Sequence, residues 1–285
     1  MRSNFHFCKG KNELKRHLPT QIAYNRLTYN HNTILNPQVL HPVLEQKSNC
    51  EILARNLGVR ALSTFVIAFC GIKNMHLYKD LVFDFLKGSN ATKASAFEDR
   101  LFKYHPCGHR CALLFCSYQV INLVGSYLHK EELIHLIHHF VSIIISWLCM
   151  HPGCSQFYVL AGSVTEVPAF FSSLYVSFDH GDLRGFVPGL GKAFPRVRIM
   201  LSLGTAITFI FFRALFFSFI CRHYLKDVSR AMQSSRETCQ SWKKFLSIHR
   251  FCVCAIMLIQ IFLFSYLLRY IPVVIATISD SETFM

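Results

Sequence analysis

Three kinds of ionisable side chain lie within apolar stretches of this chain. Adjacent His138 and His139 lie in EELIHLIHHFVSIIISWLCM, Glu166 lies in SVTEVPAFF, and Arg213 lies in ITFIFFRALFF. If such stretches cross a bilayer, a charge at the centre costs about 2.5–3.5 kcal/mol on insertion scales. The chain must therefore pair Glu166 and Arg213, neutralise Glu166, or bring both into contact with water.

These side chains have the chemistry of a site that handles an acyl group or binds a lipid headgroup. A neutral imidazole near a carboxylate can act as a general base or as an acyl-accepting nucleophile. His138 and His139 diverge by about 100° on a helix, so one can reach a shared cavity while the other orients it or bonds a neighbouring helix. The structural alternative is a Glu–Arg or Glu–His pair that only fixes helix register.

The stretch 131–150 has the pattern of a membrane helix with a narrow polar seam. Its polar positions fall within about a third of the helix circumference. They are Glu131, His135, His138, His139, Ser142, Ser146 and Cys149. A soluble surface helix would have a wider polar face, so we expect this seam to face a protein interior or cavity and the apolar back to face lipid.

The overall composition favours an integral membrane protein. The 285 residues are 52% hydrophobic and only 16% charged, whereas a soluble domain usually has about 25% charged residues. The net charge of +14 is expected in loops that face anionic lipid. Because no basic motif with interleaved aromatic residues occurs in a soluble region, the sequence does not predict a nucleic-acid partner.

We expect an all-α membrane bundle of six transmembrane helices around a central polar cavity. Each predicted span is close to the roughly 20 residues that a bilayer requires. The spans cover about 52–72, 107–127, 131–150, 156–178, 199–221 and 249–277. The predicted domain organisation is a polar, disordered tail at 1–50, a transmembrane domain at 51–278 and a short tail at 279–285.

The segments around the spans give further expectations. Pro168 frees a backbone carbonyl and predicts a kink in the fourth span. The segment LYKDLVFDFLKG predicts an amphipathic helix at the membrane interface, and 222–248 is expected to be a basic loop. Basic loops on both sides leave the orientation in the membrane open.

A second constellation of histidines and cysteines is expected at one membrane face. Antiparallel packing brings together the start of the second span and the end of the third span. The residues are His105, Cys107, His109, Cys111, His151 and Cys154. A zinc site, a disulfide, or unlinked cysteines beside headgroup-level histidines are the alternatives; we assign no metal site.

The motif order on successive spans resembles the TLC-domain family, which includes the ceramide synthases. Its members carry a histidine pair, then a glycine, then a run ending in Pro-Phe. The corresponding residues here are His138, His139, Gly153 and the run Thr165-Glu166-Val167-Pro168-Ala169-Phe170. Upstream, Tyr118 and Asn122 resemble the family's GYFxxD, and Phe212-Arg213 resembles a later Phe–Arg.

The resemblance implies a six-helix membrane barrel around a lipid-accessible cavity, usually in the endoplasmic reticulum. It also implies that His138 and His139 form an acyl-handling pair, as in the ceramide synthases, which join an acyl chain from acyl-CoA to a sphingoid amine. Ceramide synthases add an HDxxD run on the following span, where this chain has SVTEVPAFF. The chain therefore resembles the non-synthase branch, whose members are linked to lipid composition and trafficking.

Our leading hypothesis is a protein of membrane lipid homeostasis that binds an acyl lipid in an intramembrane cavity. The candidate catalytic residues are His138, His139 and Glu166, and the candidate lipid-binding residues are Tyr118, Asn122, Ser163 and Arg213. Acyl-CoA is the candidate acyl donor, and no cofactor is predicted. The alternatives are a non-catalytic lipid or cargo binder and, ranked last because no inverted repeat is visible, a small-solute transporter.

Overall fold

The computed structural model describes residues 42–87, 96–128, 132–151, 155–178 and 186–282. The chain divides into two compact units, Met1–Glu51 and Ile52–Met285. In the first unit the described residues form α2 (Pro42–Glu45) and the beginning of α3 (Lys47–Ala54). Most of the tail predicted at 1–50 lies outside the described residues, as does the end of the chain after residue 282.

The described part of the second unit is built from helices and contains no strand. Two π-helical segments, η2 and η7, and three short 3₁₀ segments, η3, η5 and η6, interrupt the α-helices. The elements after α3 are η2 (Arg55–Ala61), α4 (Leu62–Lys73), η3 (Met75–Leu77), α5 (Lys79–Lys87), α6 (Phe97–Phe102), α7 (Pro106–Leu128), α8 (Leu133–Met150), α9 (Gln156–Ser163), η5 (Val164–Glu166), α10 (Val167–Tyr175), η6 (Val176–Phe178), α11 (Leu190–Ala193), α12 (Pro195–Thr208), η7 (Phe209–Phe216), α13 (Phe217–Gln233) and α14 (Glu237–Glu282).

Six helical stretches in the described part of the chain are long and apolar enough to cross a membrane, which confirms the predicted all-α six-span fold class. They are Lys47–Lys73, Pro106–Leu128, Leu133–Met150, Gln156–Phe178, Pro195–Gln233 and Glu237–Phe262. The fourth span departs from regular α-helix beside Pro168, because η5 separates α9 from α10 and Pro168 lies in the first turn of α10; the kink itself stays a prediction.

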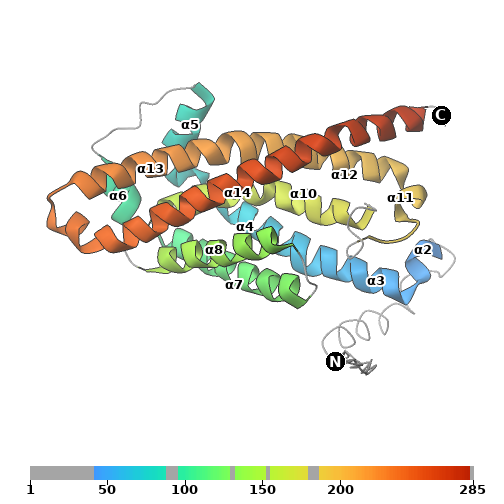
Figure 1. Ribbon diagram of the computed structural model, residues 1–285, viewed down its shortest axis with the longest axis horizontal. Helices are drawn as coiled ribbons and strands as arrows, with labels where there is room; N and C mark the ends of the chain where they lie inside the picture. The colour runs from blue at the N-terminus through green and yellow to red at the C-terminus, as the bar shows by residue number, and fades with distance from the viewer. Residues whose placement is uncertain (1–41, 88–95, 129–131, 152–154, 179–185, 283–285) are drawn as a thin grey trace, which may run out of the picture. The chain divides into compact units, whose positions relative to one another are not determined.

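The spans lie alongside one another (Figure 1), and their contacts form a closed ring. Going round it, α4 contacts α7, α7 contacts α8, α8 contacts α14, and α14 contacts α13. The ring closes through α12 on α10 and α10 on α4. The first half of the fourth span, α9, also contacts α7, α8 and α13, so it leans toward the centre of the ring.

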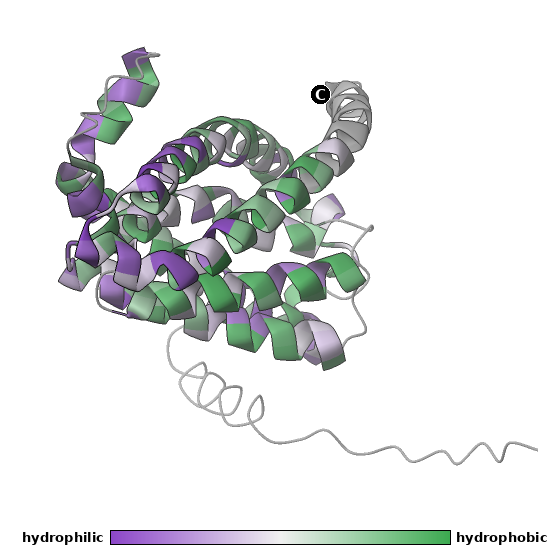
Figure 2. Cartoon of the chain, turned by 60° about the vertical axis from the view of Figure 1, so that its left-hand side comes forward, coloured by the Kyte–Doolittle hydropathy of each residue, from purple (hydrophilic) through white to green (hydrophobic). Residues whose placement is uncertain are grey.

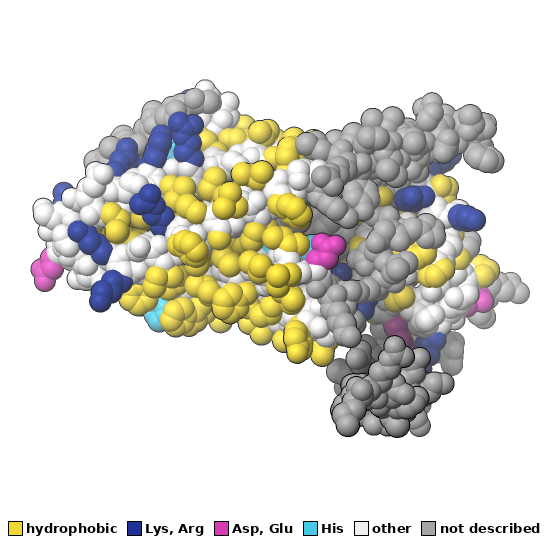
Figure 3. All heavy atoms as spheres, viewed as in Figure 1, with side chains coloured by type: hydrophobic (Ala, Val, Ile, Leu, Met, Phe, Trp, Pro, Cys, Tyr) yellow, Lys and Arg dark blue, Asp and Glu magenta, His cyan; other side chains and the backbone are white. Residues whose placement is uncertain are grey.

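The outer surface of the second unit has the polarity of a membrane protein. Ile137, Phe140 and Trp147 on α8 are 42%, 56% and 50% exposed, whereas Ser142 and Ser146 on its opposite side are buried. Hydrophobic residues make up most of the spans (Figure 2) and cover the middle of the surface in view, with Lys and Arg toward its two ends (Figure 3). The polar seam of α8 therefore faces inward, as predicted.

The prediction of a basic loop at 222–248 is wrong. Helix α13 continues to Gln233 and α14 begins at Glu237. The sequence is amphipathic, because Asp227, Val228 and Ala231 are buried while Arg222 and Arg230 are exposed. A high content of charged residues was therefore not sufficient evidence for a loop in this segment. The segment retains helical structure because one of its faces packs on the bundle.

The predicted amphipathic segment forms α5. Leu81 is buried, whereas Phe83 and Leu86 are 54% and 65% exposed. Phe85 packs by its ring edge against Phe211, Phe216 and Phe219 of the fifth span, with ring centroids 5.1–5.7 Å apart. The helix is therefore held against the bundle while two large apolar side chains remain outside; its location at the membrane interface remains a prediction.

The described cysteines and histidines form neither a disulfide nor a cluster of metal ligands. All ten described cysteines are free, and no group of three or more potential metal ligands is found among the described residues. Cys154 and Gly153 lie outside the described residues.

A glycine allows close packing between α7 and α9. A Cβ atom on Gly108 would lie 2.6 Å from the backbone oxygen of Gln156.

A buried carboxylate, Asp227, joins three elements at the end of the bundle where α13 approaches α14. Arg100 of α6 donates two hydrogen bonds to it, of 2.6 and 2.9 Å. The Tyr158 hydroxyl of α9 donates a third, of 2.6 Å. Burial alone would lower the pKa of Arg100, but its bonds to Asp227 outweigh that effect and raise the pKa. The interaction thus anchors α6 and α9 to α13.

We predict that Asp227→Ala lowers the free energy of unfolding by about 3–5 kcal/mol, because it leaves the Arg100 charge buried without its partner. Thermal unfolding of the purified protein in detergent measures this. Arg236→Ala is the matched control: it breaks the exposed 2.6 Å pair with Glu98, which is worth at most about 1 kcal/mol. Equal shifts for the two variants would contradict the prediction.

Candidate functional site

A partly open cavity of about 120 Å³ lies among the spans. Side chains from α7, α8, α9 with η5, η7 with α13, and α14 form its wall. Five of the six spans therefore contribute to it. Most of the wall is apolar, including Phe115, Ile145, Phe217, Val253 and Ile256. The polar side chains are concentrated at particular places in the wall, which is typical of pockets that fix the orientation of an apolar ligand.

Glu166 and Arg213 meet in this cavity. The Nη2 atom of Arg213 donates a 2.6 Å hydrogen bond to Oε1 of Glu166. The Arg213 side chain is 12% exposed and the Glu166 side chain 6%. Both residues belong to non-α turns, since Glu166 ends the 3₁₀ segment η5 and Arg213 lies in the π segment η7. Such turns re-aim side chains and often occur at functional sites. The two ionisable groups expected at membrane depth are therefore paired.

His138 lies on the cavity wall from the α8 side. Its Nδ1 atom is buried and has no hydrogen-bond partner among the described residues. A buried ring nitrogen without a partner is costly, so the His138 side chain retains unused hydrogen-bonding capacity beside the cavity. Arg213 has hydrogen-bonding capacity beyond its bond to Glu166, because a guanidinium carries five N–H donors.

His139 points to a different place from His138. Its Nδ1 lies 2.6 Å from Oε1 of buried Gln119 on α7, and it does not belong to the cavity wall. The expectation that one histidine of the pair reaches the cavity while the other bonds a neighbouring helix is confirmed. The contact of His139 with Gln119 holds α8 against α7, which is the most extensive helix pair of the ring.

The remaining predicted residues divide into two groups. Ser163 lies on the cavity wall, and its hydroxyl donates a 2.7 Å bond to the carbonyl of Leu160 one turn earlier. Tyr118 and Asn122 do not form part of the wall. The Tyr118 hydroxyl nevertheless has Asn122, Glu166 and Arg213 as its electrostatic neighbours, so both residues lie beside the ion pair.

Sequence reasoning missed three polar side chains at the other end of the cavity: Tyr158, Tyr224 and His249. The Tyr224 hydroxyl is hydrogen-bonded to His249 Nδ1 at 2.8 Å, and His249 Nε2 lies 3.6 Å from the thiol of Cys149. A weak signal existed, because His249, Val253 and Ile256 share one face of a helix. The two tyrosines lie in mixed runs whose periodicity does not separate them from ordinary core residues.

The geometry gives the cavity one hydrogen-bonding end and an apolar remainder. At the first end, His138 and the Arg213–Glu166 pair face the same space. A carbonyl-containing group could accept a bond from Arg213 and lie beside the His138 imidazole. The apolar remainder offers contacts of the kind that an alkyl chain makes.

Comparison with known proteins gives one finding. A family model described as TLC domain matches residues 56–269, from η2 into α14. No curated protein and no solved structure matches the chain.

We predict a strong energetic coupling between Glu166 and Arg213. Arg213→Met or Glu166→Leu alone leaves one charge buried without a partner and should cost about 3–5 kcal/mol. The double variant removes both charges, so it should be less destabilised than the sum of the single variants by about 0.5–3 kcal/mol. Thermal unfolding in detergent gives the three values.

Lys192→Met, which removes an exposed cation outside the ion pair, is the control for this cycle. It should change stability little. Additive effects of the Glu166 and Arg213 variants would show that the two side chains do not stabilise each other.

Proposed function

We propose, for a chain that belongs to the TLC-domain family, that the cavity binds an acyl lipid and that the protein acts in membrane lipid homeostasis. The observation that carries the proposal is that His138 and the Arg213–Glu166 pair line the same mostly apolar cavity. We further propose the endoplasmic reticulum as its membrane, an expectation that comes from the family.

The charges in the cavity favour a neutral acyl group over an anionic headgroup beside Arg213. Glu166 lies 2.6 Å from the guanidinium, so the pair has no net charge. A phosphate would meet the Glu166 carboxylate at the same place, and like charges at that distance repel strongly where water is scarce. A carbonyl oxygen needs only an N–H donor and brings no charge.

The same geometry supports His-dependent acyl transfer from an acyl thioester such as acyl-CoA. In this step a hydroxyl or amine acceptor attacks the acyl carbonyl carbon while His138 takes the acceptor's proton. The carbon–sulfur bond breaks, the thiol leaves with the proton from His138, and the acyl group remains on the acceptor. Arg213 would donate a hydrogen bond to the carbonyl oxygen as negative charge develops on it.

A non-catalytic lipid or cargo binder is the second candidate, and one observation favours it. The carboxylate of Glu166 is bonded to Arg213, which counts against a catalytic role in which Glu166 would orient a histidine. A binder requires the cavity and a hydrogen-bonding end but does not require proton transfer by His138.

The test is lipidomics of cells that lack the protein, rescued with wild type, His138→Gln or His139→Gln at matched expression. Under the acyl-transfer hypothesis, wild type restores a specific class of acyl lipid, and His138→Gln restores less than about a tenth of it, because a positioned base contributes about 10²–10⁴-fold. We expect His139→Gln, whose contact lies outside the cavity, to retain most of the rescue.

Each outcome has a defined meaning. Full rescue by His138→Gln with a measurable acyl-lipid phenotype supports the binder instead of the transferase. No acyl-lipid difference between the deletion and wild type would count against both candidates. Equal loss with both histidine variants, at normal protein level and thermal stability, would contradict the separate roles of His138 and His139.

A further inference from the structure

The cavity is elongated along the helices. On α8 the wall residues His138, Ser142, Ile145 and Ser146 follow one helical face. On the fifth span the wall residues also follow one helical face, and the first and last are eleven residues apart; they are Arg213, Phe217, Ile220 and Tyr224. At the rise of an α-helix, eleven positions correspond to roughly 16 Å. A ligand that fills the cavity is therefore extended and lies parallel to the spans.

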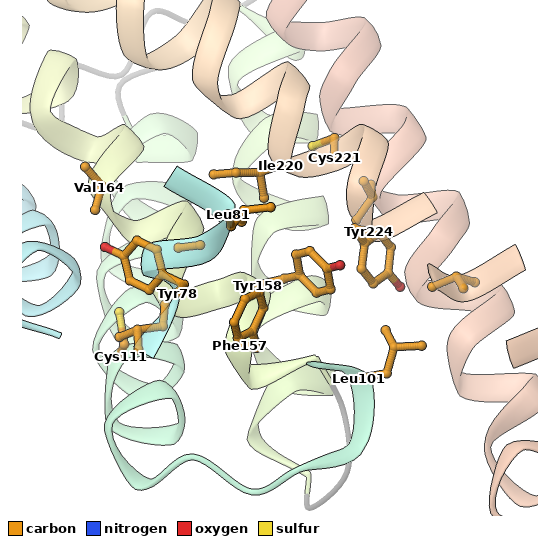
Figure 4. Packing of buried hydrophobic residues seen from close by; sticks show 14 of the residues in the cluster. Tyr78, Leu81, Leu101, Cys111, Phe157, Tyr158, Val164, Ile220, Cys221 and Tyr224 are labelled. Carbon is orange, nitrogen blue, oxygen red and sulfur yellow. The ribbon is translucent and has the colours of Figure 1, made fainter. Parts of the chain in front are cut away.

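The two ends of the cavity differ in chemistry. The first end holds His138, Glu166 and Arg213, with a ring nitrogen that lacks a protein partner among the described residues. The second, here called the aromatic end, is formed by Tyr158, Tyr224 and His249. In Figure 4, the side chain of Tyr158 from α9 points toward the ring of Tyr224 from α13.

At the aromatic end the polar atoms are already engaged within the protein. The Tyr158 hydroxyl donates to Asp227, which Arg100 also holds. The Tyr224 hydroxyl is hydrogen-bonded to His249. The rings also pack edge to face, with centroids of Tyr158 and Tyr224 5.3 Å apart and those of Tyr224 and His249 4.8 Å apart. These contacts fix the three rings and leave mainly ring carbon facing the cavity.

The wall between the two ends is mostly apolar, and the hydroxyls of Ser146 and Ser163 donate to backbone carbonyls of their own helices. Ile220 is 3% exposed, Val253 9% and Ile256 6%. A methylene chain buries favourably against such a surface, at about 0.8 kcal/mol for each CH₂ group removed from water. Such a chain cannot extend past the aromatic end without displacing rings that are held by hydrogen bonds and packing.

We propose that the cavity accepts a single acyl chain with its carbonyl at His138 and Arg213 and its terminal methyl group against the aromatic end, which sets the maximum chain length. This inference rests on the proposed function, because it assumes that an acyl lipid occupies the cavity. The aromatic residues act by excluding longer chains and take no part in a reaction.

The experiment is native mass spectrometry of the full chain in detergent, incubated with an equimolar series of saturated 1-monoacylglycerols of increasing chain length. These probes carry a neutral ester carbonyl and one chain. Tyr224→Ala, which opens the aromatic end, should shift the preferred probe to longer chains. Val253→Phe and Ser146→Leu, which fill the cavity, should shift it to shorter chains.

The expected change in the ratio of long to short probes bound is about tenfold or more, because one methylene that does not fit a hydrophobic pocket costs at least that. Tyr224→Phe keeps the ring and loses only the hydroxyl, so it should retain the wild-type preference. Leu258→Phe places a phenylalanine ring on the outward face of α14, where Leu258 is 68% exposed, and should have no effect.

Two negative outcomes are distinguishable. If wild type binds none of the probes, the proposed function fails and the inference fails with it. If wild type binds them but every variant that folds, as judged by thermal unfolding, keeps the same chain-length preference, the proposed function stands and the inference is overturned. The two filling variants come from different helices, so a folding defect in one leaves the other as a test.

Discussion

The buried pair of Glu166 and Arg213 is the constraint to which the rest of the bundle conforms. Neither side chain can be left alone at membrane depth, so the fourth and fifth spans must bring them within hydrogen-bond distance. Each span departs from regular α-helix where it supplies its partner, through a 3₁₀ turn at Glu166 and a π turn at Arg213. The contact of α10 with α12 maintains this register along the same two spans. The cavity follows, because α9 leans inward before the break and α10 leaves the centre after it.

A second polar anchor keeps the cavity from collapsing at its other end. Asp227 holds Arg100 and Tyr158, while Tyr224 and His249 bond to each other. These groups satisfy their polar atoms within the protein, so the apolar side chains between the two anchors need not interdigitate across the ring. Dense packing there would remove the cavity, as it does in ordinary protein interiors. The two anchors together therefore keep an apolar space open between them.

Much of this arrangement could be predicted from sequence because hydropathy and helical periodicity carry the information. The six spans, the inward seam of α8 and the break near Pro168 all follow from them. The 100° divergence of His138 and His139 also follows from helix geometry, although the partner of His139, Gln119, does not. The helical continuation through 222–248 was missed because its stability comes from one buried face around Asp227. Tyr224 and His249 were missed because only tertiary packing distinguishes them from other aromatic residues.

The unequal surroundings of the two adjacent histidines limit what chemistry the site can support. His139 is committed to Gln119, so its ring is fixed in a helix contact. His138 lines the cavity beside an ion pair whose charges cancel, and its Nδ1 atom has no hydrogen-bond partner among the described residues. Such a site is suited to a neutral group with one acceptor oxygen. An acyl carbonyl has that character, and its chain continues into the apolar part of the same cavity. The hydrogen-bonding end and the apolar walls thus point to the same class of ligand for independent physical reasons.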